Sequence, residues 1–171
     1  LEGMRDFGPC MSPTSAFHIL QGVETLPMRM ERHVANAGEM AAFLAAHDAV
    51  AWANHPSLPN HPDTALTKKY FPKGAGSIVC FGVKGGRKAG EKAIERVELF
   101  SHLANVGDAK SLILHPASTT HQQLTAAQLD KASIGEDMIR LSIGLEDVDD
   151  LMADLDQALR ASCLLYTSPS P

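Results

Sequence analysis

The feature that most constrains the fold is a short alternating segment near the C-terminal end of the chain. Residues 139–145 read Ile-Arg-Leu-Ser-Ile-Gly-Leu, so a large apolar side chain occupies every second position. Successive side chains of a β-strand point to opposite faces of a sheet. The pattern therefore predicts a strand with one face in a core, and it places the guanidinium of Arg140 on the opposite face.

Around this strand the sequence predicts an α+β fold. Residues 77–83 form a second apolar strand, and residues 50–53 and 113–114 are shorter candidates. A long helix that reads as a connector precedes them, and the order of elements indicates helices covering a small, mostly antiparallel sheet. Apolar spacing and capping residues predict helices at residues 12–22, 27–44, 63–71, 87–98, 125–131 and 147–159.

Composition argues against several classes of partner. The 171 residues carry 15 Lys and Arg against 20 Asp and Glu, a formal net charge of -5, so we expect no nucleic-acid partner. No apolar run reaches the roughly 20 residues that cross a bilayer, and the first residues do not resemble a signal peptide. Three widely spaced cysteines favour a reducing compartment. We therefore expect a cytoplasmic protein with no membrane contact.

Two familiar ligand-binding patterns are incomplete. Residues 85–92 resemble a phosphate-binding loop, but Glu91 stands where that motif needs lysine, so a glycine turn from strand to helix is the better interpretation. The eight histidines lack the spacing of a zinc-binding helix. Hydrogen bonding within loops is the expected role of histidines such as His55 and His115, and we expect no metal site.

Residues 101–121 form the segment most suggestive of a binding site. They combine polar side chains with Gly107 and Pro116 around a short apolar run, as loops that line sites do, although a plain surface loop is the alternative. Arg140 favours a site, because a guanidinium on the face away from the core needs an anion and its planar fork suits a carboxylate. A salt bridge to an Asp or Glu of the chain is the competing explanation.

Three ordered motifs in this region resemble the O-acetylhomoserine sulfhydrylases, which belong to the pyridoxal-phosphate (PLP) enzymes of cysteine and methionine metabolism. Shorter matches extend the resemblance over nearly all of residues 1–162. The motifs are Leu-Ala-Asn-Val-Gly-Asp-Ala-Lys-Ser-Leu at residues 103–112, His-Pro-Ala-Ser-Thr-Thr-His at residues 115–121 and Arg-Leu-Ser-Ile-Gly-Leu-Glu at residues 140–146.

The resemblance implies the C-terminal part of a fold-type I PLP-dependent transferase. Residues 1–48 would be the end of the large domain and the connecting helix, and residues 49–162 the small C-terminal α+β domain. Residues 163–171 break the helical periodicity, and we expect a disordered tail whose sequence looks foreign to the domain.

The family's Schiff-base lysine lies in an upstream domain, so the resemblance places no catalytic and no cofactor-binding residue in this chain. Lys68, Lys69, Lys73 and Lys110 lie outside the family's lysine motif. The chain alone is therefore expected to be inactive, and a non-catalytic binding module is the alternative description of it in isolation.

Three residues match substrate-binding positions of the family. Arg140 matches the arginine that binds the substrate α-carboxylate. Asn105 matches a position whose side chain and neighbouring backbone help to hold that carboxylate, and Thr120 matches a hydroxyl that orients the arginine. His55 and Ser57 depart from the family, in which Tyr and Gly are expected.

The implied reaction is γ-replacement, in which PLP serves as the electron sink. Acetate leaves O-acetyl-L-homoserine, and sulfide or methanethiol adds to give homocysteine or methionine. The family also implies a homotetramer whose sites are completed across a dimer interface. Cystathionine γ-synthases and γ-lyases are the alternative within the family, but Asn105 followed by Val106 favours the sulfhydrylases.

Overall fold

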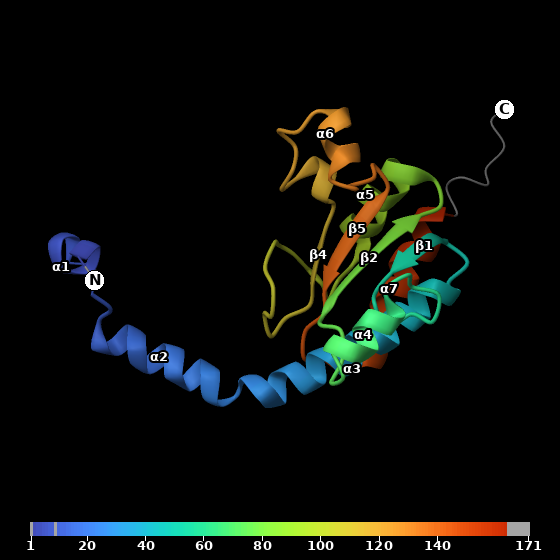
Figure 1. Ribbon diagram of the computed structural model, residues 1–171. Coiled ribbons are helices and arrows are strands. Elements are labelled where there is room, and N and C mark those ends of the chain that lie inside the picture. Colours follow the sequence, from blue (N-terminus) through green and yellow to red (C-terminus); the bar gives the residue numbers. More distant parts are fainter. Residues whose placement is uncertain (1, 9, 164–171) are drawn as a thin grey trace, which may run out of the picture.

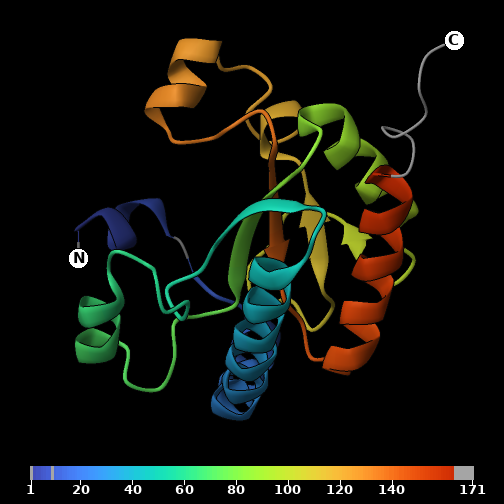
Figure 2. The same cartoon turned by 90° about the vertical axis from the view of Figure 1, so that its right-hand side faces the viewer.

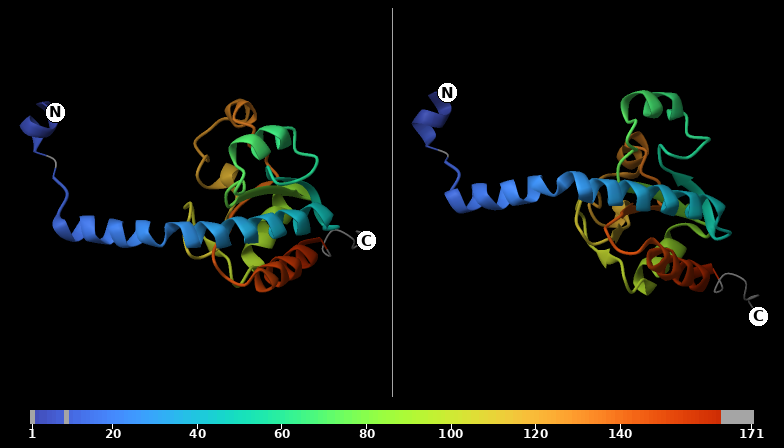
Figure 3. Two further views of the ribbon diagram at one scale, coloured as in Figure 1. Left: turned by 60° about the horizontal axis from the view of Figure 1, so that its bottom comes forward. Right: turned by 90° about the horizontal axis from the view of Figure 1, so that it is seen from below.

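The N-terminal part of the chain is an extended helical arm. The computed structural model describes residues 2–8 and 10–163, and it begins with helices α1 (Glu2–Phe7), α2 (Pro13–Glu24) and α3 (Leu26–Ala46). Helices α1 and α2 project from the rest of the molecule, and α2 buries none of its residues (Figures 1 and 3). Only the later turns of α3 pack on the sheet.

The sheet has five strands and is mostly antiparallel, as the sequence predicts. Four strands pair antiparallel, and the two-residue strand at one edge runs parallel to its neighbour. The order across the sheet is β1 (Val50–Asn54), β2 (Ile78–Val83), β5 (Met138–Ser142), β4 (Leu112–Leu114) and β3 (Ser101–His102).

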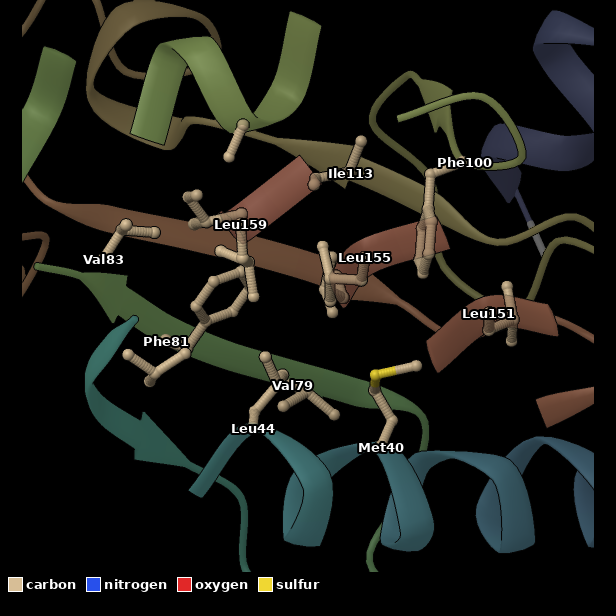
Figure 4. Close-up of a cluster of buried hydrophobic side chains, with 14 of the residues drawn as sticks. Met40, Leu44, Val79, Phe81, Val83, Phe100, Ile113, Leu151, Leu155 and Leu159 are labelled. Carbon is tan, nitrogen blue, oxygen red and sulfur yellow. The ribbon is translucent and has the colours of Figure 1, made fainter. Parts of the chain in front are cut away.

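One face of the sheet carries the core. Helices α3, α5 (Gly86–Arg96) and α7 (Val148–Cys163) cover it, and Figure 2 shows α3 and α7 side by side. Apolar side chains from α3 and α7 meet those of β2 and β4 between the layers (Figure 4). Leu155 is fully buried there, and burying such a side chain stabilises a fold by about 1.5–3 kcal/mol.

Three short helical segments lie in the connections: α4 (Thr64–Tyr70), the 3-10 turn η1 (Pro116–Ser118) and α6 (Ala126–Lys131). The glycine turn predicted before α5 is confirmed, because Gly85 and Gly86 have φ angles of 99° and 66°. Such angles are open to glycine without steric cost. Glu91 accepts a hydrogen bond from Arg87 at 2.8 Å and so pairs within α5.

Helix α1 and strand β3 were not predicted, and the largest departures from the predicted boundaries are at the ends of β5 and α7. Strand β5 ends at Ser142, three residues early. The Ile143 amide still bonds to the Ser77 carbonyl just before β2, but the Ile143 and Gly144 carbonyls bond to side chains of α3, and the Leu145 amide bonds to the loop before β4. Helix α7 includes Cys163, which we expected in the disordered tail, and the rest of that tail lies outside the described residues. No helix among the described residues is long and apolar enough to cross a membrane.

Candidate functional site

Arg140 lies in the middle of the sheet face that the core leaves open. Its Cα pairs with Cys80 of β2 on one side and with Leu114 of β4 on the other, while Cys80 in turn pairs with Asn54 of the edge strand. The neighbouring positions Ile139 and Leu141 are fully buried in the core. The predicted orientation of the guanidinium, opposite the core, is confirmed.

The guanidinium of Arg140 has one hydrogen bond in the described part of the chain. Its Nη2 donates to the backbone carbonyl of Asn105 at 3.3 Å. No Asp or Glu of the described residues lies within ion-pair distance of it. The competing explanation, an internal salt bridge, therefore has no partner there, and the remaining N–H groups can serve an external anion.

Asn105 presents its backbone, and not its side chain, to Arg140. The side-chain Nδ2 donates to Asp108 Oδ2 at 3.2 Å, and Oδ1 accepts from the Val106 amide at 2.8 Å. Asp108 also accepts a hydrogen bond from the Lys110 amide at 3.1 Å. This bond and, to a smaller extent, the bond from Asn105 lower the pKa of the Asp108 carboxyl. The side chains thus close a compact turn that aims the Asn105 carbonyl at the guanidinium.

Thr120 lies apart from this contact. Its side chain is exposed, and Oγ1 forms a hydrogen bond with His121 Nδ1 at 2.8 Å. No hydrogen bond joins Thr120 to Arg140 among the described residues. The structure therefore brings two of the three predicted site residues together, and the role of Thr120 stays a prediction.

Two buried histidines stabilise the loops around the open face, as expected of imidazoles in loops. His115 bonds to the Ser118 hydroxyl and, through Nε2, to the backbone carbonyl of Glu136, both at 2.8 Å. His55 bonds to the Ser57 hydroxyl at 2.7 Å, so the two residues that depart from the family contact each other. Burial lowers the pKa of His55. The described residues contain no group of three potential metal ligands.

Sequence reasoning missed a polar clamp at the end of β5. The carboxylate of Glu146 accepts hydrogen bonds from the Ser111 amide at 2.7 Å and from its hydroxyl at 2.8 Å. The same hydroxyl accepts from the Gly144 amide at 2.7 Å. From the other side, Asn36 of α3 donates to the carbonyls of Gly144 and Glu146 at 3.1 and 2.9 Å. These bonds join the connecting helix, the end of β5 and the start of β4.

The described residues do not by themselves fit PLP, which needs a lysine amine inside a pocket. Every lysine is exposed. A cavity of about 430 Å³ lies beside β1 and α6, but its charged lining groups are the acidic Asp130 and Asp137, and no lysine or arginine lines it. The open face therefore presents a guanidinium without a carboxylate partner among the described residues, and it lacks the groups that would hold the cofactor.

A comparison with protein families decides the classification. Residues 2–160 match the family model described as Cys/Met metabolism PLP-dependent enzyme. The chain belongs to this family. The match includes both Asn105 and Arg140, so the contact described above lies within the family domain.

Relatives within the family support the predicted resemblance and are much longer than this chain. It is 52% identical over 161 residues to the O-acetyl-L-homoserine sulfhydrylase of Leptospira meyeri, covering 94% of this chain and 36% of that protein. For O-acetyl-L-homoserine sulfhydrylase 1 of Thermus thermophilus the identity is 46%, covering 93% and 38%. The chain thus spans little more than a third of the length of the curated relatives it matches.

A solved structure confirms the fold. A Campylobacter jejuni protein described as an O-acetylhomoserine (thiol)-lyase superposes with a TM-score of 0.86 at 45% identity, covering 92% of this chain and 37% of that one. Its crystal structure contains a lysine joined to pyridoxyl phosphate. The α+β architecture of the present chain is that of the C-terminal part of such an enzyme.

Proposed function

We propose that the chain is the substrate-carboxylate-binding part of a PLP-dependent O-acetylhomoserine sulfhydrylase. The complete enzyme would replace the acetate of O-acetyl-L-homoserine by sulfide to give homocysteine, or by methanethiol to give methionine. The cofactor and its lysine would belong to the rest of that enzyme. The observation that carries the proposal is the guanidinium of Arg140, which stands on an open sheet face with one backbone partner and no carboxylate partner in the described residues.

The proposed role of Arg140 is to fix the amino-acid substrate. A bidentate pair with the α-carboxylate holds the substrate in one orientation, so that its reactive carbons face the cofactor side of the site. The carbonyl of Asn105 steadies the guanidinium from the side. We propose that the Thr120 hydroxyl helps to orient the guanidinium in the complete enzyme. We also propose that the complete enzyme is a homotetramer located in the cytoplasm.

A hybrid enzyme tests the proposal. The segment of the Leptospira meyeri sulfhydrylase that matches this chain is replaced by the chain, and homocysteine formation from O-acetyl-L-homoserine and sulfide is measured. We expect activity with bound PLP, and Arg140→Lys should raise KM by about 10- to 100-fold, since a point charge replaces the bidentate fork. An inactive hybrid, or unchanged kinetics in the variant, contradicts the proposal. The chain alone should not acquire the absorbance of bound PLP.

Another relative suggests the second candidate. The chain is 40% identical over 162 residues to an L-methionine gamma-lyase of Pseudomonas deceptionensis. A lyase, like the cystathionine γ-lyases, would eliminate the γ-substituent without adding a thiol. Ammonia and a 2-oxo acid released by the hybrid in the absence of sulfide would favour the lyase over the sulfhydrylase. Homocysteine formed with sulfide, and no 2-oxo acid released without it, would exclude the lyase.

A further inference from the structure

The bonds at the end of β5 continue to the guanidinium of Arg140. Ser111 is the last residue of the loop between β3 and β4, and its amide and hydroxyl both donate to the Glu146 carboxylate. The Leu145 amide donates to the carbonyl of Ala109 at 2.9 Å, which adds a second tie between the two segments. The loop of residues 103–110, which carries the Asn105 carbonyl, is thus attached at its C-terminal end to the end of β5.

The space around these bonds is confined. Ser111 is fully buried. A Cβ at Gly144 would lie 2.5 Å from the Ala109 carbonyl oxygen and would also collide with the Glu146 carboxylate. The close approach of the two backbones therefore needs glycine at this position. A hydroxyl and a carboxylate in such a confined place fix the loop more precisely than apolar packing would.

We propose that Glu146 and Ser111 are positioning residues of the carboxylate site, an inference that rests on the proposed role of Arg140. They hold the loop in the position at which the Asn105 carbonyl accepts a hydrogen bond from Arg140. The guanidinium is then turned so that its other N–H groups form a fork for the substrate carboxylate. Neither residue touches the substrate; both act through the loop.

The clamp also connects the site to the helical arm. Asn36 donates to the backbone carbonyls on either side of Leu145, and His33 Nδ1 forms a hydrogen bond with the Ile143 carbonyl at 2.6 Å. Both side chains belong to α3 and are buried. Helix α3 therefore contacts the segment after β5, and this segment in turn holds the C-terminal end of the loop.

Kinetics of the hybrid enzyme test the proposal. Glu146→Ala should raise KM for the amino-acid substrate by about tenfold, roughly the effect of one lost charge-assisted hydrogen bond, with kcat changed less than about threefold. The preference for the substrate over its α-carboxamide should narrow by a similar factor. Ser111→Ala removes the hydroxyl but keeps the backbone amide bond to Glu146, so it should move both values in the same direction and provides the test if Glu146→Ala does not fold.

Asp154→Ala is the matched control. Asp154 of α7 likewise accepts backbone hydrogen bonds from a loop, at 2.8 and 2.9 Å from the amides of Glu98 and Leu99. Its removal should lower stability while leaving KM and the carboxylate preference unchanged. Equal effects of Asp154→Ala and Glu146→Ala on these values would show a general loss of stability and overturn the proposal.

Arg140→Lys in the same hybrid distinguishes a failure of the proposed carboxylate-binding function from a failure of the positioning role. If Arg140→Lys leaves KM and the carboxylate preference unchanged, the proposed function fails. If it alters both values while Glu146→Ala and Ser111→Ala do not, the positioning role fails and the carboxylate site stands. Hydrogen exchange on the 171-residue chain itself, outside the hybrid, gives an independent readout, since Glu146→Ala should speed exchange of the Leu145 amide and Asp154→Ala should not.

Discussion

Replacing Ser111 by alanine should destabilise the chain far more than the small change in volume suggests. The substitution removes a hydroxyl hydrogen bond to the Glu146 carboxylate at 2.8 Å, and bonds to charged groups contribute about 1.5–3 kcal/mol. It also leaves the buried Gly144 amide without its acceptor, which costs about 1–3 kcal/mol. Because the two effects share one hydroxyl and overlap, we expect a total loss of about 2–4 kcal/mol in the free energy of unfolding.

Urea unfolding followed by circular dichroism measures this loss, and Ser142→Ala is the matched control. Ser142 is also buried at the end of β5, but its hydroxyl has no hydrogen-bond partner in the described structure. Its removal should change the free energy of unfolding by less than about 0.5 kcal/mol, or stabilise the chain, because no bond is lost. Equal losses in the two variants would refute the argument that the Ser111 bonds, and not serine burial as such, matter.

Three further predictions concern the packing and the charges. Leu155→Ala in the core should lower the free energy of unfolding by about 2–5 kcal/mol in the same urea assay, and a loss below about 1 kcal/mol would contradict the described packing. Gly82→Ala places a Cβ against the indole of Trp52, so it should destabilise by about 1–3 kcal/mol and shift the fluorescence of this single tryptophan; an unchanged spectrum would count against the contact. The hydrogen bond from Arg160 lowers the pKa of the Asp156 carboxyl. The ionised carboxylate therefore stabilises the fold fully above the ordinary Asp pKa, and this contribution is lost as the pH falls through the lowered pKa. Asp156→Asn should therefore flatten the decline in stability between about pH 5 and pH 2, and an unaltered decline would be inconsistent with this pairing.

The sequence predicts the elements whose signal is local. Alternation in residues 139–142 and the apolar stripe of α7 correspond directly to a strand with one buried face and to a helix packed on the core. The helix predicted from Thr125 begins with contacts between close neighbours, because Thr125 and Gln128 form a capping box at its first turn. Such features require no knowledge of the distant chain.

Long-range polar contacts have no comparable local signal. Glu146 and Ser111 lie 35 positions apart, and nothing in either segment's periodicity pairs them. His33 and Asn36 occupy buried positions on α3, but a search for apolar stripes passes over them because they are polar. Strand β3 has two residues and exists through its pairing with β4. The resemblance located Asn105, yet the contact with Arg140 uses the backbone, which residue identity does not reveal.

A crystal structure of the hybrid enzyme with an unreactive amino-acid analogue would test the central claim most directly. We predict both carboxylate oxygens of the analogue within about 2.7–3.2 Å of guanidinium nitrogens of Arg140, with the Asn105 carbonyl still on the guanidinium. An analogue whose carboxylate binds to other groups, with Arg140 turned away from it, would contradict the assignment of this chain as the carboxylate-binding part of the enzyme.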